Sequence, residues 1–266
     1  MKPSSDLLRP LNVFTAVADT LAGLALGFGG LAAVPAHGFW LLGASALLYL
    51  GAAALNDYRN RHAALGMAVG LLALGLVFAW AGRAVGPALA LAAAIVLYDA
   101  ALEDTSLGFL DMGACRGLNL SLALAIAPHP SALAIAAAIA LTAYVATLTY
   151  LSRAEVGGGS RLRTRRGKLA LGWIAGLIAV SLSLTPSPFF GGVFLFALLA
   201  RAIPLFTPLW TATDAAATRS AIGGGILLIP LFDATFVAAS ARPLSALLVA
   251  SLMLPAMGLR RLDSAS

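Results

Sequence analysis

Residues 62–81 read HAALGMAVGLLALGLVFAWA and contain no Asp, Glu, Lys or Arg. A helix needs about 20 such residues to cross the hydrocarbon core of a bilayer, where only a helix satisfies every backbone N–H and C=O group without water. Similar apolar runs follow one another along the whole chain. The pattern predicts an all-α integral membrane protein.

The composition agrees with this fold class. Of 266 residues, 61% are hydrophobic and 11% are charged, which is too little charge to cover a soluble globule of this size. We see no strand pattern and no separate polar domain, so we expect one domain, residues 1–266. Ten spans are expected near residues 11–33, 38–57, 62–81, 86–104, 112–127, 131–152, 168–185, 189–207, 218–239 and 242–259. Pro204, Pro230 and Pro255 lie inside expected spans and should kink them.

The basic residues predict a topology, because Lys and Arg accumulate in cytoplasmic loops. If the N-terminus is cytoplasmic, 15 of the 17 basic residues fall on the cytoplasmic side, and only Arg83 and Arg242 fall on the other. This favours an even number of spans, both termini in the cytoplasm, and a multi-pass protein of the cell (inner) membrane. Nine spans with one re-entrant segment is the alternative.

The net charge of +6 does not indicate nucleic-acid binding. The basic loop, residues 161–168, has no interleaved aromatic residues and adjoins a membrane, so anionic lipid headgroups are its expected neighbours. The apolar run after Lys2 and Arg9 is longer than that of a secretory signal, and we expect it to remain as the first helix. The single cysteine, Cys115, excludes an internal disulfide.

Polar residues gather at the ends of the even-numbered spans. Asn56, Asp57 and Asn60 end the second span, and Asp99 and Glu103 end the fourth at a spacing that places both on one helix face. Further along the chain come Asp111, Arg116, Arg153 and Glu155. All of these lie on the expected cytoplasmic side, where they could line one cavity that opens to the cytoplasm.

Carboxylates and amides suit an oxygen-ligated Mg²⁺ that holds phosphate oxygens, while arginines can bind the same oxygens directly. The alternative is a set of interfacial charges that only neutralise one another. Asp19 and Asp233 are expected deeper in the membrane, where each should pair or stay protonated, with a structural role or a proton relay as the two interpretations.

Three segments resemble the UbiA superfamily of intramembrane prenyltransferases, and more closely its EboC branch. RPLNVFTAVADTLAG, residues 9–23, is similar to the first helix of that branch. LYDAALEDTSLGFLDMGACRGLN, residues 97–119, resembles a YDA motif that runs into an MGxCRxLN helix start, and TYLSRAEVGGGSR, residues 149–161, resembles SRxEVxGG. The resemblance covers nearly the whole chain.

The resemblance implies a bundle of about nine to ten helices around a central cavity, Mg²⁺ as cofactor, and transfer of an isoprenyl group from a diphosphate to an acceptor. Carried over to matching positions, it implies one set of diphosphate-binding residues and one of metal ligands. The diphosphate-binding residues are Asn12, Asn56, Asp57, Asn60, Arg116 and Arg153. The metal ligands are Asp57, Asp99, Glu103 and Asp111.

The sequence also departs from the family pattern. Of the family's NDxxDxxxD motif, Asn56 and Asp57 match, but Asn60 and Ala64 stand where carboxylates are usual, and Glu103 stands where the branch usually has Lys. The metal site is either rebuilt around Asp57, Asp99, Glu103 and Asp111 or abandoned. Three hypotheses therefore remain: a prenyltransferase, a non-catalytic carrier or permease subunit for a lipid-like metabolite, and a structural membrane partner of other enzymes.

Overall fold

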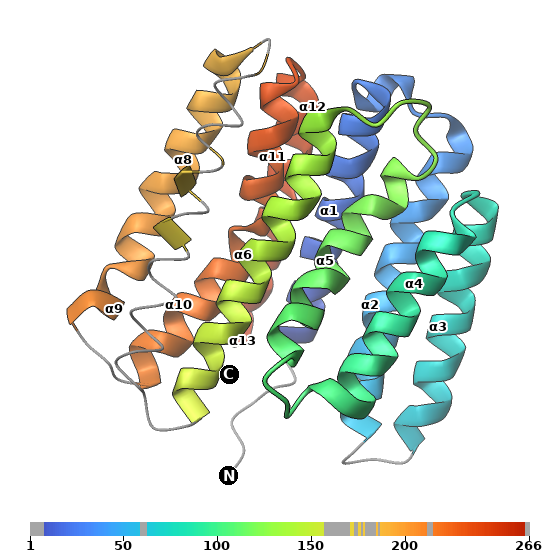
Figure 1. Cartoon of the computed structure of the whole chain (residues 1–266), viewed down its shortest axis with the longest axis vertical. Coiled ribbons are helices and arrows are strands. Elements are labelled where there is room, and N and C mark those ends of the chain that lie inside the picture. Colours follow the sequence, from blue (N-terminus) through green and yellow to red (C-terminus); the bar gives the residue numbers. More distant parts are fainter. Residues whose placement is uncertain are drawn as a thin grey trace.

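The computed structural model describes residues 8–58, 63–156, 187–211 and 215–263, with residues 171, 172, 175, 176, 178 and 185. These residues form helices joined by short turns, and no strand occurs among them (Figure 1). The all-helical prediction is confirmed for this part of the chain.

The elements run in the following order. They are α1 (Leu8–Phe28), η2 (Leu31–Ala33), η3 (Ala36–Phe39), α2 (Trp40–Tyr58), α3 (Ala63–Ala81), α4 (Val85–Leu97), η4 (Tyr98–Leu102), α5 (Gly108–Leu124), α6 (Ala132–Val156), α8 (Pro188–Phe206), α9 (Pro208–Thr211), α10 (Ala215–Leu227), α11 (Ile229–Ala239), α12 (Pro243–Ser251) and α13 (Met253–Asp263).

Six helical segments in the described residues are long and apolar enough to cross a membrane. They are Ala36–Asp57, Ala64–Ala81, Val85–Leu102, Ala132–Ser152, Pro188–Phe206 and Ala216–Ala239. Asn12–Phe28 and Pro243–Gly258 are shorter apolar helices. The expected span at residues 168–185 lies largely outside the described residues. The multi-pass character is therefore supported, whereas the count of ten stays a prediction.

Large apolar side chains on the outside of the bundle fit a lipid environment. Trp80 is 72% exposed, Phe196 75% and Leu244 76%. In water such side chains would be an aggregation hazard, but against acyl chains they carry no desolvation cost.

The first helix is shorter than expected, because the chain turns at two glycines. Gly29 and Gly30 have φ values of 69° and 130°, which residues with a side chain rarely adopt, and α1 therefore ends at Phe28 rather than near residue 33.

Two of the expected proline kinks are one-residue interruptions between consecutive helices. Pro230 lies in the first turn of α11, just after α10 ends at Leu227, and Pro255 lies in the first turn of α13, after α12 ends at Ser251. A proline needs no N–H partner in a first turn, so each interruption costs little. Pro204 remains inside α8.

The helix ends sort into two groups, as expected for a chain that crosses back and forth. The α3–α4, α5–α6 and α11–α12 connections lie at one end of the bundle, while the end of α2, the η4–α5 connection and the end of α6 lie at the other (Figure 1). Arg116, which was expected near the cytoplasmic end of its span, is only 4% exposed within α5.

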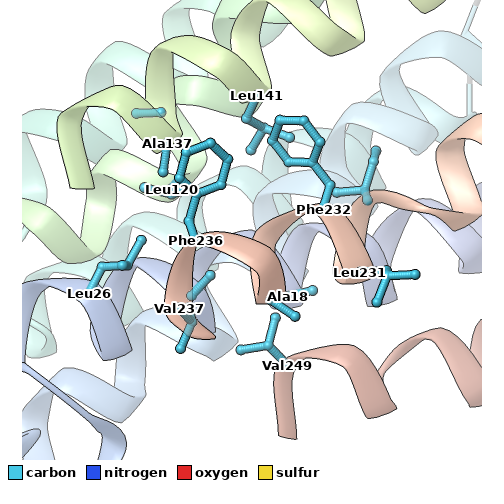
Figure 2. Packing of buried hydrophobic residues seen from close by; sticks show 14 of the residues in the cluster. Ala18, Leu26, Leu120, Ala137, Leu141, Leu231, Phe232, Phe236, Val237 and Val249 are labelled. Carbon is cyan, nitrogen blue, oxygen red and sulfur yellow. The ribbon is translucent and has the colours of Figure 1, made fainter. Parts of the chain in front are cut away.

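The main core lies where α11 packs against α1, α6 and α12. Phe232 and Phe236 of α11 point toward α6, where Phe232 lies beside Leu141 and Phe236 beside Ala137 (Figure 2). Every residue of α11 is buried, so this helix forms the centre of one half of the bundle.

Glycines allow α1, α5 and α6 to approach closely. A Cβ added to Gly23 of α1 would lie 2.9 Å from the Cβ of Ala123 and would clash with the Leu120 carbonyl oxygen of α5. A Cβ on Gly117 of α5 would collide with the Thr142 hydroxyl of α6. These are the small-residue contacts that hold membrane helices together.

We predict that Gly23→Ala lowers the unfolding temperature in detergent, because overpacking costs about 1–3 kcal/mol. Gly70→Ala is the matched control: it lies on α3, and a Cβ there meets nothing within 4 Å. It should leave stability unchanged or raise it by up to about 1 kcal/mol through helix propensity. Equal unfolding temperatures for the two variants would contradict the packing described.

Candidate functional site

A pocket of about 240 Å³ opens between α1, α2, α4, η4 and α5. It is lined by Asn12, Tyr49, Ala52, Ala53, Asn56, Ile95, Tyr98, Asp99, Met112 and Cys115. Three of the predicted site residues, Asn12, Asn56 and Asp99, therefore come together from three different elements. They lie more than 40 positions apart in the sequence.

The pocket is polar at one end and mostly apolar at the other. Asn56 belongs to the last turn of α2, whereas Tyr49 lies seven residues earlier, which corresponds to about 10 Å along a helix. Ile95, Met112 and Cys115 add apolar walls. Such a pocket suits a ligand with a polar group and a hydrocarbon part.

The Asn56 side chain joins two acids from the neighbouring helical segment. Its Nδ2 donates to Asp99 Oδ1 and to Glu103 Oε1, each at 3.4 Å, which is long for a hydrogen bond. The expectation that Asp99 and Glu103 share one face is confirmed by this common partner. Both distances leave room for the side chains to draw closer around a bound ion or ligand.

A π-helical turn carries these acids. In η4 the Glu103 N–H donates to the Tyr98 carbonyl oxygen at 2.8 Å, five residues earlier, instead of four as in an α-helix. Such turns are rare and frequently lie at functional sites. The periodicity of the sequence gave no sign of it.

The predicted metal ligands do not assemble into one cluster. Among the described residues, no group of three or more His, Cys, Asp or Glu side chains is arranged to hold a metal ion. Asp57 lies at the end of α2 and Asp111 in the first turn of α5, and neither lines the pocket. Asp111 Oδ2 is buried without a hydrogen-bond partner.

Asn60, a predicted diphosphate-binding residue, lies outside the described residues, and Arg153 is described only as part of the helix α6. Their roles stay predictions.

Arg116, predicted to bind phosphate, is engaged inside the bundle. Its Nη1 donates to Asp19 Oδ2 at 2.8 Å, and its Nη2 donates to the Thr15 hydroxyl. The guanidinium also lies over the ring of Tyr49, 5.1 Å from its centroid. Arg116 therefore connects α1 to the pocket wall, and any contact with a phosphate would compete with Asp19.

Asn119 completes the arrangement one turn along α5. Its Nδ2 donates to Asp19 Oδ2 at 3.1 Å and to the Ala16 carbonyl oxygen at 2.7 Å. The Thr20 hydroxyl donates to Asn119 Oδ1 at 3.3 Å. The expectation that Asp19 pairs is confirmed, with Arg116 as its partner.

Tyr49 was not predicted, and Tyr98 and Met112, which belong to the YDA and MGxCRxLN motifs, were assigned no role. The spacing from Tyr49 through Ala52 and Ala53 to Asn56 follows one helix face and would have indicated Tyr49. The MGxCRxLN motif alone did not place Met112 on the pocket wall, because its position there depends on how α5 packs.

No family model matches the chain, and neither a curated protein nor a solved structure matches it.

We predict that Asn56→Asp makes the stability of the protein depend on divalent cations. Three carboxylates would then meet where the amide now separates two, so the unfolding temperature should fall in EDTA and recover with Mg²⁺. Asn56→Ala, which adds no charge, is the control and should show no such recovery. If Asn56→Asp responds to Mg²⁺ no more than Asn56→Ala does, the proximity of the three side chains is wrong.

Proposed function

We propose that this chain is a UbiA-like membrane prenyltransferase that binds an isoprenyl diphosphate in the pocket and transfers its isoprenyl group to an acceptor. The observation that carries the proposal is the contact of Asn56 with both Asp99 and Glu103 at the polar end of a pocket that is otherwise mainly apolar and aromatic. An isoprenyl diphosphate has the same division into a charged head and a hydrocarbon chain.

The acidic end of the pocket requires a cation between protein and ligand, because Asp99 and Glu103 would repel a diphosphate. Two carboxylates fit Mg²⁺, which usually takes one or two carboxylates and completes its shell with waters and phosphate oxygens. Asp99 and Glu103 would hold the ion, and the Asn56 amide, whose Nδ2 now faces both acids, would turn its oxygen toward it. When bound, Mg²⁺ supplies positive charge that stabilises a departing diphosphate.

The apolar part of the pocket would hold the carbon chain and keep water from the reacting carbon. Its volume of about 240 Å³ is below the usual range of about 300–1,000 Å³ for small-molecule sites. We therefore expect the pocket to hold the head and the first part of the chain, while the remainder lies against the helices and lipid.

Binding of a radiolabelled isoprenyl diphosphate to the purified protein tests the proposal. We predict binding that requires Mg²⁺, is abolished by EDTA, and falls at least about tenfold in Asp99→Asn, because one charge-assisted ligand bond is worth about 1.5–3 kcal/mol. Ala52→Phe, which fills the pocket, should also abolish binding.

Ala93→Phe provides the matched control. It makes the same substitution on α4, at an exposed position outside the pocket, and should bind like wild type. Failure of wild type to bind in Mg²⁺, or equal binding by Ala52→Phe and Ala93→Phe, would overturn the proposal.

A further inference from the structure

Asp233 lies in the most enclosed helix of the protein. It is 1% exposed, and every residue of α11 from Ile229 to Ala239 is buried. An isolated carboxylate in such a place is very costly, so the group must be paired or neutral.

Asp233 interacts with Asp19 of α1, the helix that packs against α11, and Asp19 is fully buried as well. Asp19 Oδ2 accepts from Arg116 and from Asn119. In contrast, Asp19 Oδ1 and both oxygens of Asp233 receive no N–H or O–H group from any other described residue. Two carboxylates have no hydrogen to share, so a hydrogen bond between them requires a proton.

The balance of charge in the interior also indicates that one of the two acids is protonated. With both acids ionised, Asp19, Asp233 and Arg116 would carry a net charge of −1 in the interior. No other charged side chain in the described residues offsets it. Tyr144 of α6 donates its hydroxyl to the Gly225 carbonyl oxygen, and Arg201 of α8 and Arg219 of α10 are exposed.

Among the described side chains, the other elements around α11 supply no further cation. Tyr49 of α2 lies against Arg116, α12 carries no titratable residue, and the side chains of Arg260, Arg261 and Asp263 of α13 lie outside the described part.

We propose that Asp19, Asp233 and Arg116 form a proton-binding site in the interior of the bundle, in which Asp233 carries the proton and donates it to Asp19. The assignment to Asp233 follows from the partners: the two donors on Asp19 favour its ionised form, whereas Asp233 has none. Because the shared proton joins α11 to α1, loss of the proton would place two like charges between these packed helices.

Infrared spectroscopy of the full-length protein in lipid tests the proposal. A protonated carboxyl group has a C=O stretching band that a carboxylate lacks and that shifts in D₂O. At neutral pH we expect this band in wild type and its loss in Asp233→Asn. Asp111→Asn is the control, because Asp111 also has a buried oxygen, and it should keep the band. Absence of the band from wild type, or its loss in Asp111→Asn alone, would overturn the proposal.

Thermal unfolding provides a second measurement. Asp233→Asn replaces a protonated carboxyl group by a neutral amide of the same shape and should unfold close to the wild-type temperature, whereas Asp19→Asn leaves Arg116 buried without its partner and should unfold at a much lower one. Equal losses would contradict the proposal. If Na⁺ stabilises the protein more than an organic cation does at the same ionic strength, the site binds a metal ion and not a proton. That result would also overturn the proposal.

Discussion

The buried ion pair of Arg116 and Asp19 is the contact on which the interior of this protein depends. It joins α5 to α1 in the buried interior, and removing one partner of such a pair costs about 3–5 kcal/mol because the other charge is left unpaired. The same two helices contribute to the pocket, through Asn12, Met112 and Cys115, and to the interior cluster, through Asp19 and Arg116. A shift of the Arg116 side chain would therefore alter both the pocket and the interior cluster.

The close packing of small residues brings the helices near enough for these side chains to meet. Gly23, Gly113 and Gly117 bring α1, α5 and α6 within backbone contact, so the Arg116 side chain can reach the Thr15 hydroxyl and Asp19 together. The polar groups then lie in two layers. One is the closed cluster in the interior, and the other is the end of the bundle where Asn56, Asp99 and Glu103 meet the pocket.

Much of the architecture could be predicted from apolar run length and charge placement. The helices α2, α3, α6 and α8 lie close to the expected spans, because a run without charged residues has few alternatives to a membrane helix. The grouping of Asn56, Asp99 and Glu103 was also predictable, since their positions at the ends of alternating spans place them on one side.

Other features depended on packing that a sequence does not display. Arg116 was expected to bind phosphate, and its burial could not be foreseen, because an arginine inside a bundle is acceptable only when a partner such as Asp19 comes from a distant helix. Three other features likewise depend on neighbouring helices. They are the π-helical turn at Tyr98–Leu102, the interruptions before Pro230 and Pro255, and the position of Met112 on the pocket wall. Among the described residues, Asp57, Asp99, Glu103 and Asp111 do not form a group of three that could hold a metal ion, and the sequence could not have indicated this, because position along a helix fixes depth but not distance across the bundle.

The central claim is that the pocket between α1, α2, α4 and α5 holds an amphiphilic ligand with its charged head near Asn56 and Asp99. Photo-crosslinking with an isoprenyl diphosphate that carries a photoreactive group on its first isoprene unit tests this claim most directly. The account predicts Mg²⁺-dependent crosslinks to Ile95, Met112 or Cys115, mapped by mass spectrometry. Crosslinks confined to lipid-facing residues such as Phe196 and Leu244, with and without Mg²⁺, would contradict it.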